Sequence, residues 1–290
     1  MIELKNENLS VGVLSSAGGS LSYLKFKGED LLRPSSSQET EANQSALFPM
    51  LPYASFIQEG RFPYFGIVRT VEKNSPFSKF PMHGDVWRAN LNLEEQSETS
   101  LVLSYHHDKK QGFPFSYDAK VKYTLRENIF EVVLTLKNNS VLPMPFGMGL
   151  HPFFKREADT FVQFEADKIW FRGDDPILGH PYTAPANLNF KDGHQISGNG
   201  MNISFGSWNS RATVSYPSKN ISVDILADNS FRHLILYAPK GKDFFCLEPV
   251  TNTPDAFNLA SVGIFGTGIQ SLGPNQTVSG KIEFVLKGLK

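Results

Sequence analysis

The feature that most constrains this chain is a strict alternation of apolar and polar side chains in residues 117–125. Tyr117, Ala119, Val121, Tyr123 and Leu125 alternate there with Asp118, Lys120, Lys122 and Thr124. Successive side chains of a β-strand point to opposite faces, so a period of two predicts a half-buried strand. Shorter runs with the same period occur at residues 9–13, 21–23, 221–225 and 282–286.

Polar turn signals separate these runs, at residues 17–19, 27–30, 137–140, 217–220 and 227–229. Short strands joined by short turns are typical of an antiparallel sandwich or barrel. Helical signals are weak, since residues 37–46 and 255–260 each suit only a turn or two. There is no strand–helix alternation and no fixed repeat, which disfavours parallel α/β folds and propellers. The composition does not shift along the chain, so we expect one all-β domain over residues 1–290.

Composition and charge exclude several classes of function. The net charge is −1 with no basic cluster, so a nucleic-acid partner is not expected. No apolar run reaches the ~18 residues that span a bilayer, and the polar start lacks a signal peptide, which indicates a cytoplasmic protein with no membrane partner. The single cysteine, Cys246, cannot form an internal disulfide. Because Phe245 and Leu247 flank it, we expect a buried apolar side chain there.

His151 is the first residue suited to chemistry. It precedes Pro152, Phe153 and Phe154 and follows two glycines. Proline biases the preceding residue towards extended backbone and interrupts a ladder, so we expect His151 at a strand end. An imidazole that titrates near neutral pH suits a proton donor. A hydrogen-bonded structural histidine is the alternative reading.

Glu248 is the second such residue. On a strand, Phe244, Cys246 and Glu248 share one face, and Pro249 follows directly, which predicts a carboxylate at the end of an apolar strand. Partial burial there raises the pKa of a carboxyl group and makes it a better base. The alternative is a carboxylate that only anchors the loop at residues 251–252.

His83 lies in a second turn with Asp85 and Trp87, which we place on the same extended face. The indole of Trp87 offers a flat surface for a sugar ring. The other histidines lack partners at metal-ligand spacing, and the sequence has no phosphate loop and no Gly-x-Ser-x-Gly motif. A metal or nucleotide enzyme is therefore disfavoured.

Taken in order, these motifs resemble the aldose 1-epimerase (galactose mutarotase-like) family over nearly the whole chain. The two most specific runs are Gly-Leu-His-Pro-Phe-Phe at residues 149–154 and Glu-Pro-Val-Thr-Asn-Thr-Pro-Asp-Ala-Phe-Asn at residues 248–258. Others lie at residues 47–49, 60–62, 83–84, 170–181, 206–212, 236–239 and 273–276.

The resemblance implies a large antiparallel β-supersandwich that holds a small-molecule sugar in an open cleft. It also implies an isomerase that interconverts the α and β anomers of an aldose with no metal and no cofactor. In this family the residue at Glu248 takes the proton from the anomeric hydroxyl, and the histidine at His151 protonates the ring oxygen. The residue at His83 helps to hold the substrate.

The chain departs from the family pattern at positions expected to contact the sugar. Ser55 and Phe56 stand where an Asn-Arg pair is common, and Asn202 stands where the galactose-specific branch has an aspartate. Arg61 is a possible substitute for the missing guanidinium. We expect these residues, with Asp85 and Trp87, to set which sugar is bound.

Two alternative functions stay open. The first is a mutarotase for hexose 6-phosphates, for which Arg88, Lys155 and Arg172 are the basic residues available. The second is a carbohydrate-binding protein without turnover, although such a protein has no need of a matched acid and base. The sequence gives no indication of the oligomeric state.

Overall fold

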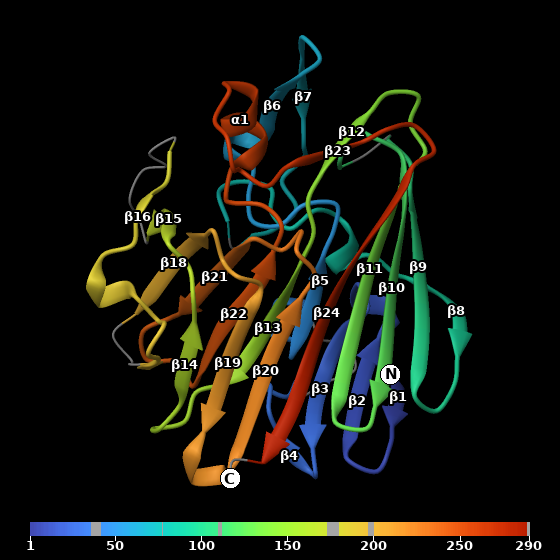
Figure 1. Ribbon diagram of the computed structural model, residues 1–290. Helices are drawn as coiled ribbons and strands as arrows, with labels where there is room; N and C mark the ends of the chain where they lie inside the picture. The colour runs from blue at the N-terminus through green and yellow to red at the C-terminus, as the bar shows by residue number, and fades with distance from the viewer. Residues whose placement is uncertain (36–41, 77, 110–111, 173–179, 197–199, 289–290) are drawn as a thin grey trace.

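The computed structural model describes residues 1–35, 42–76, 78–109, 112–172, 180–196 and 200–288. Two large sheets dominate this part of the chain (Figure 1). The first has eleven strands, in the order β1 (Ile2–Lys5), β2 (Leu9–Leu14), β3 (Ser20–Phe26), β5 (Leu47–Met50), β13 (Gly149–Lys155), β22 (Phe244–Val250), β21 (His233–Ala238), β18 (Met201–Gly206), β15 (Lys168–Arg172) and β16 (Tyr182–Thr183), with β4 (Glu29–Asp30) beside β3.

The second sheet has nine strands, in the order β17 (His194–Gln195), β14 (Phe161–Phe164), β19 (Arg211–Tyr216), β20 (Ile221–Ala227), β24 (Thr277–Gly288), β11 (Ile129–Asn138), β10 (Tyr117–Arg126), β9 (Ser100–His107) and β8 (Asn92–Gln96). The neighbouring strands of both sheets pair antiparallel, for example β10 with β11 and β13 with β22. The predicted all-β antiparallel architecture is confirmed.

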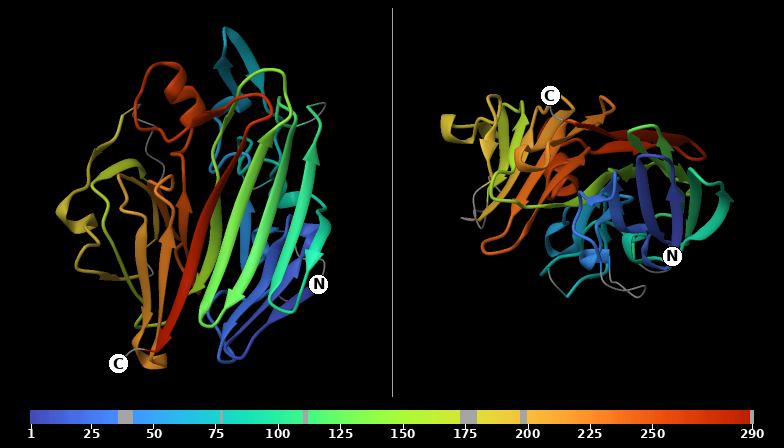
Figure 2. Two further views of the ribbon diagram at one scale, coloured as in Figure 1. Left: turned by 45° about the vertical axis from the view of Figure 1, so that its right-hand side comes forward. Right: turned by 90° about the horizontal axis from the view of Figure 1, so that it is seen from below.

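Alternating burial explains how the sheets face each other. On β10, the five apolar residues from Tyr117 to Leu125 are buried and the residues between them are not. Phe284 of β24 stacks on Phe130 of the same sheet and also contacts Phe154 of the first sheet, with ring centroids 6.4 Å apart. Large aromatic rings therefore fill the space between the two sheets, and Figure 2 shows the two layers after a 45° turn and from below.

Several short elements gather at one end of the sandwich, at the top of Figure 1. They are the hairpin β6 (Arg61–Tyr64) and β7 (Ile67–Thr70), the pair β12 (Met144–Phe146) and β23 (Gln270–Leu272), and the helix α1 (Ala256–Ser261). The predicted turn of helix at residues 255–260 corresponds to α1. Of the other weak helical segment, residues 42–44 form a 3₁₀ turn and residues 37–41 lie outside the described part. Within the described residues no helix is long and apolar enough to cross a membrane.

The outer face of the first sheet carries the polar residues of interest. Phe154 and Phe245 point towards the second sheet, so their neighbours along β13 and β22 point away from it. These outward residues include Phe153, Cys246 and Val250, which belong to a separate apolar cluster with Phe48 of β5 and Trp87. The central strands β5, β13, β22, β21 and β18 thus form the floor of a second, smaller compartment.

Candidate active site

His151 lies in the middle of β13, where its imidazole is held between two aromatic rings. Its ring centroid is 4.4 Å from that of Phe48 and 4.6 Å from that of Phe153, both in stacked geometry. The prediction that Pro152 ends the strand at His151 is wrong. Residues 149–152 of β13 pair with β5, with His151 opposite Phe48, and residues 153–155 then pair with β22, so the strand continues beyond the proline.

Glu248 lies on the adjacent strand β22, and the prediction that this strand ends there is also wrong. Pairing with β21 continues through Glu248 and Pro249 to Val250. The register between β13 and β22, fixed by the pairs Gly149–Val250 and Phe153–Cys246, places His151 directly opposite Glu248. The two prolines occupy the stretch between those pairs, where the missing N–H groups interrupt the ladder.

The two side chains meet in a buried environment. His151 Nε2 is 3.2 Å from Glu248 Oε1, and only 11% of the histidine side chain and 3% of the glutamate side chain are exposed. Burial raises the pKa of Glu248 well above its usual value. Burial, and after it the charges of the neighbouring His83 and Arg33, lower the pKa of His151. Both shifts favour the uncharged forms, so the pair readily holds one transferable proton between imidazole and carboxyl.

His83 is the third member of the cluster, and its geometry defines its protonation. The backbone N–H of Ser55 donates a hydrogen bond to His83 Nδ1 at 3.2 Å. Burial also lowers the pKa of His83 to about 3, so the ring is neutral at physiological pH. With Nδ1 acting as acceptor, the proton of the neutral ring lies on Nε2. His83 is therefore a fixed, uncharged hydrogen-bond donor next to His151, with ring centroids 5.5 Å apart.

A left-handed turn presents His83 to the site. His83 and Gly84 have φ values of 61° and 68°, so residues 83–85 are not the extended segment that the sequence predicted. A Cβ atom at Gly84 would overlap the carbonyl oxygen of Leu51, which explains why glycine follows the histidine. Trp87 Nε1 donates back to the carbonyl of Gly84 at 3.0 Å and closes the turn.

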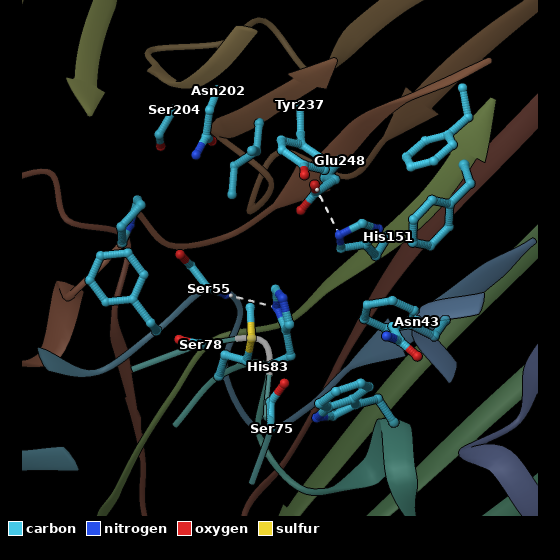
Figure 3. A pocket seen from close by; sticks show the side chains of 18 residues that line it. Asn43, Ser55, Ser75, Ser78, His83, His151, Asn202, Ser204, Tyr237 and Glu248 are labelled. Atoms are coloured by element: carbon cyan, nitrogen blue, oxygen red, sulfur yellow. Dashed lines mark hydrogen bonds and ion pairs between the residues drawn. The ribbon is translucent and has the colours of Figure 1, made fainter. Parts of the chain in front are cut away.

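These residues surround a cavity of about 460 Å³ on the outer face of the first sheet (Figure 3). Its polar lining residues are Asn43, Ser55, Ser75, Ser78, His83, His151, Asn202, Ser204, Tyr237 and Glu248. Its other lining residues are Phe48, Phe56, Met82, Trp87, Phe153, Ile235, Phe244 and Pro254. The size suits a small molecule, and the mixture of flat apolar rings with convergent polar groups is typical of a sugar site.

Most of the site residues expected from sequence line this cavity, but two do not. Arg61 begins β6 with an exposed side chain. Asp85 faces the core instead, where its Oδ2 atom accepts a hydrogen bond from the Tyr117 hydroxyl at 3.3 Å and lies 3.4 Å from His107 Nδ1. The Asp85 carboxylate is thus engaged by core residues, and it does not line the cavity.

Sequence reasoning missed part of the lining. Ser204 lies two residues after Asn202 on β18 and so shares its face, and Tyr237 of β21 pairs with Asn202. Because every second side chain of a strand points to the same face, the position of Asn202 would have predicted that Ser204 also lines the cavity. Its hydroxyl is buried and has no hydrogen-bond partner among the described residues.

Three side chains with metal-binding donor atoms lie close together here, and two of them, His151 and Glu248, line the cavity. One ligand atom each of His151, Cys246 and Glu248 lie within 4.8 Å of one another, and all three residues are buried. Spacing along the chain could not reveal this group, because His151 and the other two residues come from different strands.

Comparisons with known proteins identify the family. The sequence model of the family described as aldose 1-epimerase matches residues 1–284. The Escherichia coli K12 protein YphB is 26% identical over 250 residues, which cover 83% of this chain and 85% of YphB.

Solved structures share the fold. A proposed aldose 1-epimerase from Escherichia coli K12 superposes with a TM-score of 0.90 at 23% identity and covers 99% of this chain and 98% of its own. A galactose mutarotase-like protein from Clostridium acetobutylicum superposes with a TM-score of 0.85 at 18% identity, with 99% and 95% covered. At these identities the structures establish the fold alone, whereas the match over residues 1–284 establishes the family. This chain belongs to the aldose 1-epimerase family.

Proposed function

We propose that the protein is a mutarotase that interconverts the α and β anomers of a neutral aldose by acid–base catalysis. The observation that carries this proposal is the His151–Glu248 pair, with Nε2 and Oε1 3.2 Å apart at the floor of the cavity. Ring opening of a hemiacetal needs a base at the anomeric hydroxyl and an acid at the ring oxygen. Two groups this close reach both oxygens of one anomeric carbon.

In the proposed reaction the Glu248 carboxylate removes the proton from the anomeric hydroxyl. The C1–O1 bond becomes a carbonyl as the bond from C1 to the ring oxygen breaks, and His151 supplies the proton to that oxygen. Rotation about C1–C2 and closure on the other face give the other anomer, with the roles of acid and base reversed. Burial favours the uncharged pair with the shared proton on Glu248, so the reactive form arises when that proton moves across the 3.2 Å to His151. In that form the raised pKa of Glu248 makes its carboxylate a stronger base, and the lowered pKa of His151 makes its imidazolium a stronger acid.

His83 has a supporting role in this proposal. Its neutral ring carries a proton on Nε2, beside His151, and can donate a hydrogen bond to a sugar oxygen without competing for the catalytic proton. Phe48 and Phe153 hold the His151 ring in one orientation, so little ordering is needed when the substrate binds.

The charge of the cavity favours a neutral sugar over a hexose 6-phosphate. Among the described lining residues, none is lysine or arginine. Arg88 donates a hydrogen bond to the carbonyl of Asn74, and Lys155 lies 3.8 Å from the Glu157 carboxylate. The third basic residue considered from sequence, Arg172, is the last residue of β15, and its side chain lies outside the described part. Among these described residues, a phosphate group in the cavity would find no lysine or arginine to bind it.

The decisive experiment measures exchange between α and β anomers by NMR for glucose, galactose and glucose 6-phosphate. We expect exchange above the buffer rate for at least one neutral sugar, and a smaller effect on glucose 6-phosphate. Binding of a sugar with exchange at the buffer rate would instead identify a carbohydrate-binding protein without turnover.

A further inference from the structure

We infer that His151, Cys246 and Glu248 form a binding site for a thiophilic divalent cation such as Zn²⁺, and that the bound metal inhibits proton transfer by the proposed acid–base pair. The three donor atoms lie within 4.8 Å of one another. Cys246 and Glu248 are two residues apart on the same face of β22, and His151 faces them from β13. The backbone of two paired strands therefore holds all three donors in place.

The ligand set matches the preferences of zinc. Cysteine sulfur, histidine nitrogen and carboxylate oxygen bind Zn²⁺ at about 2.3, 2.0–2.1 and 2.0–2.2 Å in a tetrahedral arrangement, so neighbouring ligand atoms lie roughly 3.3–3.8 Å apart. His151 Nε2 and Glu248 Oε1 are already 3.2 Å apart. The Cys246 sulfur lies within 4.8 Å of both atoms, so a movement of its side chain towards them completes the three-ligand arrangement. His151 and Glu248 both line the cavity, so the fourth position opens towards water or a sugar hydroxyl.

The charges also balance. A thiolate and a carboxylate together carry the two negative charges that neutralise a divalent cation, and a neutral imidazole adds none. Burial disfavours each of these anions alone, but the complete cluster is neutral and can remain buried. When the metal binds, it displaces the thiol proton of Cys246 and any proton held between His151 and Glu248.

The consequence for activity rests on the proposed function, whereas metal binding does not. A metal bound to His151 Nε2 and Glu248 Oε1 occupies the lone pairs that move the proton during ring opening. We therefore expect reversible inhibition of anomer exchange by Zn²⁺, relieved by a chelator.

Cobalt substitution tests the site directly. The full chain, stripped of metal and free of thiol reductants, is titrated with Co²⁺ and followed by absorption spectroscopy. Because Cys246 is the sole cysteine of the chain, a thiolate-to-cobalt charge-transfer band reports that residue alone. We expect this band to saturate at one Co²⁺ per chain and to disappear when Zn²⁺ is added in competition.

Three variants complete the test. Cys246→Ala should lose the band, and Glu248→Gln, which keeps the side-chain shape, should bind Co²⁺ more weakly. His106→Ala is the matched control. It removes an exposed histidine whose Nδ1 atom lies 2.6 Å from Asp118 Oδ1, and it should leave the band unchanged.

A wild-type chain without the charge-transfer band overturns the inference, and so does a Glu248→Gln variant with undiminished Co²⁺ affinity. The second result decides the question even if Cys246→Ala fails to fold. Absence of anomer exchange with a normal cobalt band would refute the proposed function and leave the metal site standing.

Discussion

His151 and Glu248 face each other across two neighbouring central strands, with Nε2 of the imidazole 3.2 Å from Oε1 of the carboxyl group. The register between β13 and β22 fixes this relationship in the backbone, and the rings of Phe48 and Phe153 fix the orientation of the imidazole. An acid and a base held in this way need no conformational change to act together on one anomeric carbon.

The pair therefore predicts the effect of removing either member. His151→Ala and Glu248→Gln should each lower kcat/KM for anomer exchange by about 10²–10⁴-fold, the usual contribution of a positioned acid or base. Exchange rates measured by NMR test this, with thermal unfolding to show that each variant folds. His106→Ala is the control, because its side chain is 66% exposed, and it should exchange anomers like the wild type. Wild-type rates in either site variant would refute the assigned roles.

The local sequence pattern predicted strands well where one face of the strand is buried and the other is exposed to solvent. The alternation at residues 117–125 is the clearest case, and it corresponds to β10. It failed at Pro152 and Pro249, because the prediction treated each proline as an isolated break. In the structure the pairing between β13 and β22 is interrupted at both prolines. At these positions β13 still pairs with β5, and β22 still pairs with β21. Such compensation is tertiary, so no local rule detects it.

The sequence predicted most of the residues that line the cavity but not all of their contacts. His151, Glu248 and His83 meet as the resemblance implied, since the motifs that carry them are specific. Asp85 was misplaced because its partner Tyr117 lies 32 residues away in the sequence, and only the folded chain shows the carboxylate to be occupied. The proximity of Cys246 to His151 depends on strand pairing in the same way.

Ser204 offers a test of substrate contacts. Its buried hydroxyl lines the cavity without a partner among the described residues, so a bound sugar can supply the missing hydrogen bond. Ser204→Ala should raise KM about 2- to 10-fold, equivalent to a net hydrogen bond of about 0.5–1.5 kcal/mol. The free energy of unfolding should stay the same or rise slightly, since the variant removes an unsatisfied buried group. Steady-state kinetics and urea unfolding check both expectations, and an unchanged KM would show that Ser204 does not contact the sugar.

Gly84 tests whether the left-handed turn sets the position of His83. Gly84→Ala places a methyl group against the carbonyl of Leu51 at a φ of 68°, whereas Gly66→Ala meets open space at a φ of 70°. The Gly66 variant should lose only the cost of left-handed backbone, about 1–2 kcal/mol of unfolding free energy. The Gly84 variant should lose more than this and should also lower kcat, because the turn must move. Equal losses of stability with unchanged kcat would show that the turn can relax without displacing His83.

His233 makes stability depend on pH. It begins β21 with 2% of its surface exposed, and burial lowers its pKa from 6.5 to about 4. Between these two values the unfolded chain binds a proton that the native chain excludes, so the free energy of unfolding falls as the pH falls from 6.5 towards 4. For this group the loss between pH 7 and pH 5 amounts to about 2 kcal/mol. His83, with a pKa of about 3, adds a loss of the same sign.

Urea unfolding of the wild type and of His233→Gln at pH 7 and pH 5 isolates the contribution of His233. Glutamine does not titrate, so the difference in unfolding free energy between the two pH values should be smaller in the variant by about 2 kcal/mol. The comparison uses this difference within each protein, so a general loss of stability in the variant cancels. An equal pH dependence in both proteins would mean that His233 gains its proton in the folded state, which the packing of its ring against Trp170 and the backbone near Gly268 argues against.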